Sequence, residues 1–388
     1  MSLNEAEFDD LIARTERFVA KVVIPMELDE RCGAHGPSDA LVGELRVLAR
    51  AEGLMAAHLP RSLGGRDLSM RQTAQYFRAA GYSLLGPVAL NIAAPDEGNM
   101  HLLHRVASDG QKARYLEPLA RGEARSAFLM SEPDGAGSDP ALLNTRADRD
   151  GDGWLLNGVK WLITGMDGAR FIIVMARAEE GATMFLAPAD SEGVRIVRVL
   201  DTIDRALPGG HAVVELKNVR VGADSVLGEV GQGFRYAQIR LAPARLTHCM
   251  RWLGAAERTH DIALGYAMRR TAHGQRLVDH QGVGFQLADN EIDLRQAALF
   301  TDWAAEALDR GEAAMEETSM AKVAVSEALY RVGDRSVQIL GGLGVTDDTP
   351  AHQIFRELRA FRIYDGPTEV HKWSLVKRLK RRAAERAS

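Results

Sequence analysis

Residues 126–139 read SAFLMSEPDGAGSD, and the pattern of the chain changes at this point. The stretch opens with a short apolar run and continues into proline and glycine, which are typical of turns. Before it, between Phe8 and Val22, apolar residues recur at helical spacing until Pro25 ends the run, which predicts an amphipathic helix. Similar helical windows lie at 41–51, 71–80 and 111–120. Residues 1–125 are therefore predicted to form an N-terminal helical domain.

From residue 126 onward, the apolar residues come in short runs that predict strands. Turn residues separate these runs, as in Asp150-Gly151-Asp152-Gly153. The runs are 127–130, 154–156, 171–176, 184–187, 194–199 and 212–216. About a hundred residues of this kind favour a small β-barrel or sandwich over βαβ units. The middle β domain is predicted at 126–229.

The helical period returns at Gly233 and persists. Leu246, Cys249, Met250 and Leu253, for example, would share one face of a helix. Long helices with short breaks predict a C-terminal bundle of about four helices, placed at 230–388. The predicted fold class is thus α+β and multidomain, in the order helical, β, helical.

Composition limits the kind of protein this is. The 388 residues correspond to two or three domains of roughly 150 residues each. Lys and Arg number 48 against 53 Asp and Glu, and the net charge of −5 argues against nucleic acid as a partner. No apolar run approaches the ~20 residues of a transmembrane helix, and the acidic N-terminus does not resemble a signal peptide. We expect a cytoplasmic protein without a membrane span.

Metal and dinucleotide motifs are not indicated. In the glycine-containing loop at 135–138, the third glycine position of a dinucleotide fingerprint falls on Pro140. His101 and His104 lie three apart but lack a nearby third ligand. The two cysteines are far apart and form no CxxC pair. The sequence therefore predicts no metal site.

Four stretches carry a more specific signal: SAFLMSEPDGAGSD at 126–139, NGVKWLIT at 157–164, VQILGG at 337–342 and IYDG at 363–366. In this order and spacing they resemble the acyl-CoA dehydrogenase family across essentially the whole chain. The extra residue in EPDGAGSD, and an aspartate in the last stretch, resemble the branch whose animal members are fused to a kinase-like domain.

The resemblance implies an FAD enzyme that removes hydrogen from the α and β carbons of an acyl-CoA, giving the trans-2-enoyl-CoA. It also implies electron-transfer flavoprotein as the electron acceptor and a homotetramer, with a dimer as the alternative. The α C–H is a weak acid, so the reaction needs a carboxylate as general base. The developing enolate needs fixed hydrogen-bond donors, and the flavin takes the hydride.

The base slot of the family holds Asp365 in this chain, between Tyr364 and Gly366. Most members have glutamate there, which is one methylene longer. Some members carry the base just before an arginine on a bundle helix. The matching arginine here is Arg245, and its predecessor Ala244 cannot act as a base. Asp365 is therefore the predicted catalytic residue.

The other site residues follow from the same resemblance. The predicted flavin-ring contacts are Phe128, Met130, Ser131, Ile163 and Thr164. The predicted residues for the FAD phosphates and adenine are Arg270, Gln338, Gly341 and Gly342. The predicted substrate contacts are Ser138, Arg245, Tyr364 and Gly366. One departure concerns the ring, because Leu162 takes the position of the family's tryptophan and Trp161 comes one residue earlier.

Two alternatives stay open at this point. An acyl-CoA oxidase or a nitroalkane oxidase would keep the fold and use oxygen as acceptor, although Arg245 on the CoA side favours a thioester substrate. A flavin-containing DNA-binding relative would need a strongly basic C-terminal region. The basic run at 377–382 is short, so this reading is disfavoured.

Overall fold

The structure is a computed structural model of the chain, and it describes residues 3–135, 137 and 139–387. The chain divides into two compact units. We call the described residues of 1–26, 68–87 and 242–388 the helical unit, and those of 27–67 and 88–241 the sheet unit.

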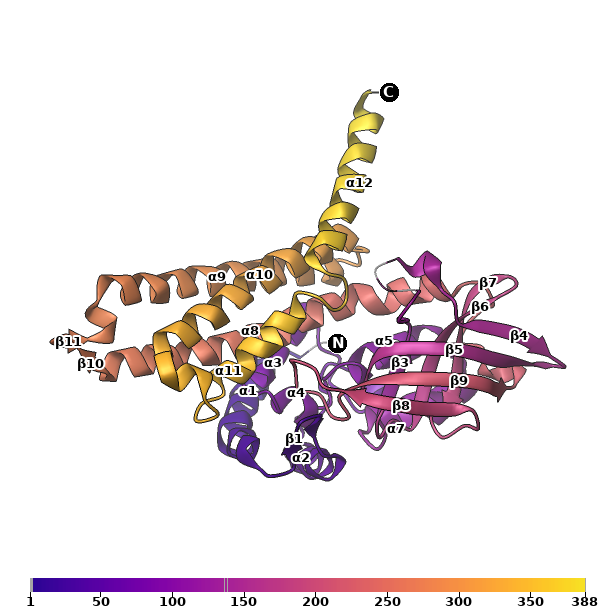
Figure 1. Ribbon diagram of the computed structural model, residues 1–388, viewed down its shortest axis with the longest axis horizontal. Helices are drawn as coiled ribbons and strands as arrows, with labels where there is room; N and C mark the ends of the chain where they lie inside the picture. Colours follow the sequence, from indigo (N-terminus) through magenta and orange to yellow (C-terminus); the bar gives the residue numbers. More distant parts are fainter. Residues whose placement is uncertain (1–2, 136, 138, 388) are drawn as a thin grey trace. The chain divides into compact units, whose positions relative to one another are not determined.

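The sheet unit is built on one seven-stranded sheet in the order β3-β6-β4-β5-β9-β8, with β7 paired to β6 (Figure 1). Its strands are β3 (Ser126–Leu129), β4 (Arg146–Asp150), β5 (Gly153–Thr164), β6 (Phe171–Ala178), β7 (Gly181–Pro188), β8 (Val194–Leu200) and β9 (His211–Val221). Strand β3 runs parallel to β6, whereas the hairpins β4–β5, β6–β7 and β8–β9 are antiparallel.

The core of the sheet unit lies on both faces of β6. Ile172 and Val174 pack with Trp154 and Phe185 on one face. The alternate residues, such as Ile173, pack on the other face against helices. A strand that is covered on both sides reads as a continuous apolar run, which is what FIIVMA at 171–176 shows.

Short helices accompany this sheet, and α5 lies next to β3 (Figure 1). The unit also contains β1 (Cys32–Gly33), β2 (Gly36–Pro37), α2 (Asp39–Ala51), α5 (Asp96–Val106), α6 (Asp109–Gln111) and α7 (Glu117–Ala120). The side chain of Ser38 accepts the backbone N–H of Leu41 and so caps the start of α2.

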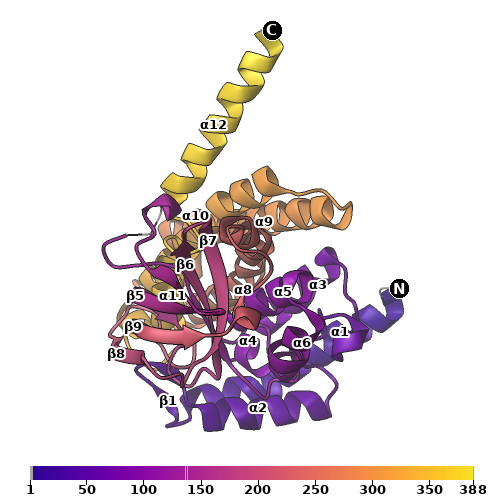
Figure 2. The same cartoon turned by 90° about the vertical axis from the view of Figure 1, so that its right-hand side faces the viewer.

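The helical unit contains long helices, of which α9 and α10 run side by side (Figure 1). Its elements are α1 (Glu5–Phe18), α3 (Met70–Gly81), β10 (Thr271–Ala272), β11 (Gln275–Arg276), α9 (Gln281–Asp309), α10 (Met315–Leu340), α11 (Ala351–Phe361) and α12 (Thr368–Ala387). Helices α4 (Gly86–Ala89) and α8 (Gly233–Arg269) begin in one unit and end in the other. Helix α12 starts against α10 and then extends away from it (Figures 1 and 2).

Two glycines let α3 and α8 approach each other closely within the helical unit. A Cβ atom at Gly81 would come within 2.0 Å of the carbonyl oxygen of Arg251. A Cβ atom at Gly254 would come equally close, 2.0 Å, to the carbonyl oxygen of Arg78. The backbones of the two helices are therefore in contact, which fixes the position of the α8 segment that carries Arg245 and its neighbours.

The predicted fold class is confirmed, with helices at the N-terminus, a curled β sheet in the middle and a helical bundle at the C-terminus. Each predicted strand run overlaps one of β3 and β5–β9, and only Met130, at the end of the run 127–130, lies outside its strand. Strand β4 was not predicted, because its sequence RADRD is mostly charged and exposed. The boundaries 1–125, 126–229 and 230–388 stay a prediction. No helix in the described part of the chain is long and apolar enough to cross a membrane.

Candidate active site

Asp365 lies in the turn between α11 and α12. Its φ is 53° and that of Gly366 is 97°, so both residues adopt left-handed backbone. Aspartate tolerates this region better than most residues, and glycine enters it without steric cost. A Cβ atom at position 366 would also lie 2.7 Å from Nε2 of His371. Both the backbone and the available space therefore require glycine after Asp365.

Helices α8 and α12 hold this turn in the helical unit. Nε of Arg245 donates to the carbonyl oxygen of Asp365 at 3.3 Å, and Nε2 of His371 donates to the same oxygen at 3.2 Å. The carboxylate contacts the imidazole of His248, with Nε2 3.3 Å from Oδ2. The Asp365 side chain is only 19% exposed. The carboxylate therefore lies against α8 and does not extend into solvent.

Tyr364 belongs to the same packed cluster. Its hydroxyl accepts a hydrogen bond from Nε1 of Trp252. Its ring centroid lies 4.9 Å from that of His248 and 5.7 Å from that of Phe361. Aromatic packing at these distances holds the tyrosine and the histidine in place next to the turn.

Cationic groups surround the Asp365 carboxylate. Burial lowers the pKa of Lys322 to about 8, although the charge of Asp365 acts in the opposite direction. Burial, together with the positive charges of Arg245 and Lys322, lowers the pKa of His371 to about 4, so His371 is neutral at pH 7. Burial also lowers the pKa of Arg245, against the charge of Asp365. An anion at this place is attracted by both cations.

The structure places Arg245 against the turn formed by Tyr364, Asp365 and Gly366, and the roles of Arg245, Tyr364 and Gly366 as substrate contacts stay a prediction. Ser138, the remaining predicted substrate contact, lies outside the described residues. The role of His248 was not predicted. Its only sequence signal is a histidine three residues after Arg245, which places both on nearby parts of one helical face.

In the sheet unit, the predicted flavin-ring residues lie at the ends of β3 and β5. The backbone N–H of Trp161 donates to the carbonyl oxygen of Ser131 at 3.1 Å. The hydroxyl of Ser131 donates in turn to the carbonyl oxygen of Trp161 at 2.8 Å. This reciprocal pair ties the segment after β3 to β5. Phe128 and Met130 are half-buried there, and Ile163 is buried.

Strand β5 contains a bulge at this point. Trp161 and Leu162 together oppose a single residue of β9, since the register shifts between Lys160 and Ile163. Leu162 has a φ of 59°, which is an uncommon conformation for a bulky residue. The Trp161 side chain is 40% exposed. The bulge therefore exposes the indole of Trp161. Leu162, which takes the family's tryptophan position, is less exposed.

Thr164, at the end of β5, begins a chain of polar contacts. Its Oγ lies 2.9 Å from Nδ1 of His211, and Nε2 of His211 lies 2.9 Å from Oδ2 of Asp204. Although burial acts to raise it, the pKa of Asp204 is lowered by its interaction with His211. Since a carboxylate only accepts, Nε2 of His211 donates to Asp204, and Nδ1 faces the Thr164 hydroxyl. Neither His211 nor Asp204 was predicted, because no motif marks them.

A buried ion pair supports the loop that follows β3. Nζ of Lys160 is completely buried, and it donates to the carbonyl oxygen of Met130 at 3.1 Å and to Oε1 of Glu132 at 2.9 Å. Glu132 also accepts the backbone N–H groups of Asn144 at 2.7 Å and Thr145 at 2.8 Å. Burial lowers the pKa of Lys160 to about 8, against the effect of Glu132. The sequence shows a lysine, Lys160, within the stretch NGVKWLIT, but no role was predicted for this lysine.

The residues predicted for the FAD phosphates and adenine lie at one end of the helical unit. Arg270 follows the last residue of α8, and Gly341, with a φ of 60°, follows the last residue of α10. Both helix ends pack on one apolar cluster, formed by Ala263, Ala267, Leu287, Ile339, Leu340 and Ala351. Arg270, Gln338, Gly341 and Gly342 are all exposed there. Their backbone and side chains are accessible to a ligand.

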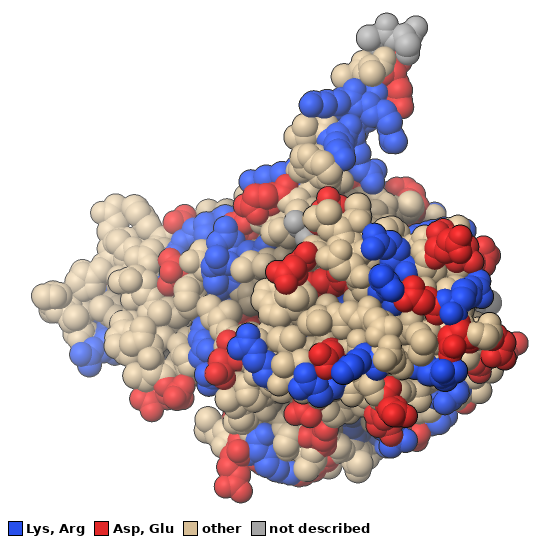
Figure 3. All heavy atoms as spheres, turned by 45° about the vertical axis from the view of Figure 1, so that its right-hand side comes forward, with Lys and Arg blue, Asp and Glu red and all other residues tan. Residues whose placement is uncertain are grey.

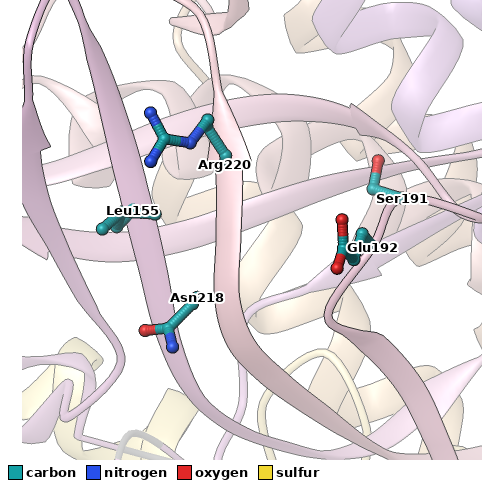
Figure 4. Close-up of a pocket in the computed structure, with 5 residues that line it drawn as sticks. All are labelled: Leu155, Ser191, Glu192, Asn218 and Arg220. Carbon is teal, nitrogen blue, oxygen red and sulfur yellow. The ribbon is translucent and has the colours of Figure 1, made fainter.

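Two surface hollows in the sheet unit contain none of the predicted residues. One of about 620 Å³ is lined by side chains of β5, β9 and the turn before β8, namely Leu155, Ser191, Glu192, Asn218 and Arg220 (Figure 4). The other, of about 690 Å³, lies around Tyr115 and Phe171. Within the described residues, no three His, Cys, Asp or Glu side chains gather to form a metal site.

Comparison with known proteins identifies the class. Family models match nearly the whole chain: the acyl-CoA dehydrogenase N-terminal domain at 5–123, the middle domain at 127–218 and the C-terminal domain at 231–380. The chain therefore belongs to the acyl-CoA dehydrogenase family, and it is an oxidoreductase of this kind.

Individual relatives support the same assignment. The chain is 36% identical over 385 residues to FadE2 of Mycobacterium tuberculosis, described as a probable acyl-CoA dehydrogenase, covering 95% of this chain and 94% of that protein. It is 33% identical to acyl-CoA dehydrogenase family member 11 of Rattus norvegicus over 95% of this chain, but it spans only 50% of that protein's length.

Solved structures agree with this assignment. A structure from Mycobacterium abscessus, assigned to the acyl-CoA dehydrogenases, superposes with a TM-score of 0.90 at 36% identity, covering 98% of this chain and 100% of that one. A glutaryl-CoA dehydrogenase from Mycobacterium smegmatis in complex with FADH2 superposes with a TM-score of 0.86 at 25% identity, covering 97% and 95%.

Proposed function

We propose that this protein catalyses the FAD-dependent α,β-dehydrogenation of an acyl-CoA thioester, with Asp365 as the general base. The assignment of Asp365 as the base rests on where its carboxylate lies. It lies largely buried against α8, in contact with His248 and near the cations Arg245 and Lys322. An exposed turn aspartate would have none of these surroundings.

The residues present are suited to FAD. At the ends of β3 and β5, the half-buried Phe128 and Met130 and the exposed indole of Trp161 offer apolar surface, and the hydroxyls of Ser131 and Thr164 lie beside them. Apolar surface with a polar edge matches a flat heteroaromatic ring. Exposed Arg270 offers a guanidinium that suits a diphosphate, and the FADH2 complex of the mycobacterial relative supports the same cofactor.

In the proposed reaction, Asp365 accepts the proton from the α-carbon while the β-carbon loses a hydride and the α,β double bond forms. FAD, when bound, supplies the acceptor for this hydride. Arg245 and His371 hold the Asp365 main chain, which keeps the carboxylate at a constant position. Arg245 and Lys322 keep positive charge close to where the proton leaves and favour the ionised base.

The test uses purified holoenzyme and a panel of acyl-CoAs of four, eight and sixteen carbons. Mixed anaerobically, at least one acyl-CoA should bleach the flavin absorbance. Asp365→Asn should keep the flavin and lose at least ~10²-fold in the bleaching rate, because an amide cannot accept the proton. Near-normal bleaching by Asp365→Asn would refute the base. Rapid peroxide formation in air without an added acceptor would favour the oxidase alternative.

Further parts of the proposal concern partners. We expect electron-transfer flavoprotein as the electron acceptor, a cytoplasmic location, and a role in fatty acid metabolism. We also expect a homotetramer, with a dimer as the alternative. Exposed apolar side chains on one face of α9 support self-association: Phe285, Ile292, Leu299 and Trp303.

A further inference from the structure

His248 contacts the Asp365 carboxylate, but it has no role in the reaction described above. Its Nε2 lies 3.3 Å from Oδ2 of Asp365, and its side chain is 8% exposed. The imidazole packs against the rings of Tyr364 and Phe361, with centroid distances of 4.9 and 6.1 Å. The ring is therefore held in one orientation next to the carboxylate.

The other side of the imidazole determines its protonation. NH2 of Arg251 lies 3.0 Å from Nδ1 of His248, and Arg251 is itself buried. A guanidinium has only donors and stays charged, so Nδ1 must offer a lone pair to it. The neutral tautomer then carries its proton on Nε2, which donates to Oδ2 of Asp365. Arg251 thus fixes the tautomer, and the tautomer makes His248 a donor to the carboxylate.

We propose that His248 is a positioning residue for the proton transfer, an inference that rests on Asp365 being the base. Its Nε2–H holds the carboxylate in one rotamer and stabilises the ionised form. Proton transfer from carbon depends on the orientation of the base within a few tenths of an ångström, so a carboxylate that is free to rotate would react more slowly. Arg251 acts one step further back, through His248.

The other charged and titratable groups around the carboxylate come from three helices. Arg245 belongs to α8, Lys322 belongs to α10, and His371 belongs to α12. The charges of Arg245 and Lys322 also favour the ionised carboxylate, so removal of His248 changes one contribution among several. The expected effect on the pH profile is therefore moderate.

Two substitutions separate the hydrogen bond from the bulk of the side chain. His248→Leu removes the donor, and His248→Gln keeps an N–H group that reaches about as far as Nε2. We expect His248→Leu to lower the limiting rate of anaerobic flavin bleaching by about 10- to 100-fold, with KM for the acyl-CoA changed less than about threefold. We also expect the acidic limb of the kcat/KM profile to move up by about one pH unit. His248→Gln should restore most of the rate and the wild-type limb.

His260 provides a matched control on the same helix. It is also buried, at 3% exposed, and its Nε2 lies 3.1 Å from Oε1 of Glu291. His260→Leu should cost similar stability in urea denaturation and leave the pH profile unchanged. If it moves the acidic limb as far as His248→Leu does, the effect is structural and the proposal fails.

The outcomes distinguish this proposal from the proposed function. If Asp365→Asn abolishes bleaching while His248→Leu keeps the wild-type rate and limb, Asp365 remains the base and His248 has no positioning role. If Asp365→Asn bleaches normally, the assignment of the base fails and this inference fails with it. If His248→Leu does not fold, a His248→Gln enzyme with a wild-type profile supports the proposal and one with a shifted limb and low rate overturns it.

Discussion

At the scale of single residues, buried charges are held by specific partners. Lys160 and Glu132 are both nearly fully buried, at 0% and 3% exposed, and they share hydrogen bonds with the backbone of the loop that leads away from β3. Such a pair need not add stability relative to apolar residues. Removing one member, however, leaves a buried charge without its partner.

Lys160→Met should therefore lower the free energy of unfolding by about 3–5 kcal/mol, because the Glu132 carboxylate stays buried. Urea denaturation followed by circular dichroism measures the change. Arg195→Gln is the control, since Arg195 pairs with Glu215 on the surface of the same unit, and it should cost less than about 1 kcal/mol. A loss for Lys160→Met as small as that of the control would contradict the role of the buried pair.

At the scale of elements, the position of α8 depends on how closely α3 approaches it. Gly81 and Gly254 allow this approach, and the Arg245, His248 and Arg251 side chains project from the same stretch of α8. The bulge in β5 acts in a comparable way, because it decides which of Trp161 and Leu162 is exposed. The close α3–α8 contact and the β5 bulge thus determine where side chains lie, although neither feature takes part in a reaction.

Gly81→Ala should destabilise the protein by about 1–3 kcal/mol, because the new methyl group would overlap a backbone oxygen of α8. Gly43 lies within α2, and a Cβ atom there would meet nothing within 4 Å. Gly43→Ala should instead stabilise by up to about 1 kcal/mol, since alanine favours the helix. The two midpoints in urea should thus move in opposite directions, and equal shifts would show that the α3–α8 contact does not limit stability.

At the scale of the whole molecule, charge is distributed unevenly. Over most of the face shown in Figure 3, acidic and basic side chains alternate, whereas Lys and Arg gather on α12. Exposed basic residues there are Lys372, Lys377, Lys380, Arg381, Arg382 and Arg386. The first turns of the same helix place His371 among Arg245 and Lys322, where burial and positive charge keep it neutral.

This environment predicts how stability depends on pH. The folded-state pKa of His371 is about 4, against 6.5 for an unperturbed histidine, so the unfolded chain binds the proton more readily. The stability that His371 contributes is present above pH 6.5 and is lost as the pH falls toward 4, amounting to about 2 kcal/mol after allowance for solvent screening. His371→Gln should show a smaller decline over this range in urea titrations at each pH. An identical decline would contradict the assignment.

The local pattern of the sequence was enough to predict the order of the domains. Helical spacing, short apolar runs and turn residues predicted the order helical, β, helical, because each depends only on neighbours along the chain. Strand β4 escaped this reasoning because its charged residues carry no apolar pattern. The resemblance of IYDG to a known motif also picked out Asp365 among 53 acidic residues.

Only the tertiary structure decided what surrounds those residues. His248 faces Asp365, Lys160 faces Glu132 and His211 faces Thr164 across 117, 28 and 47 positions of sequence. These contacts depend on how helices and strands pack, and packing depends on side chains from many distant segments at once. The sequence could therefore single out Asp365 as the proposed base, but its contacts with His248 and His371 follow from the folded arrangement alone.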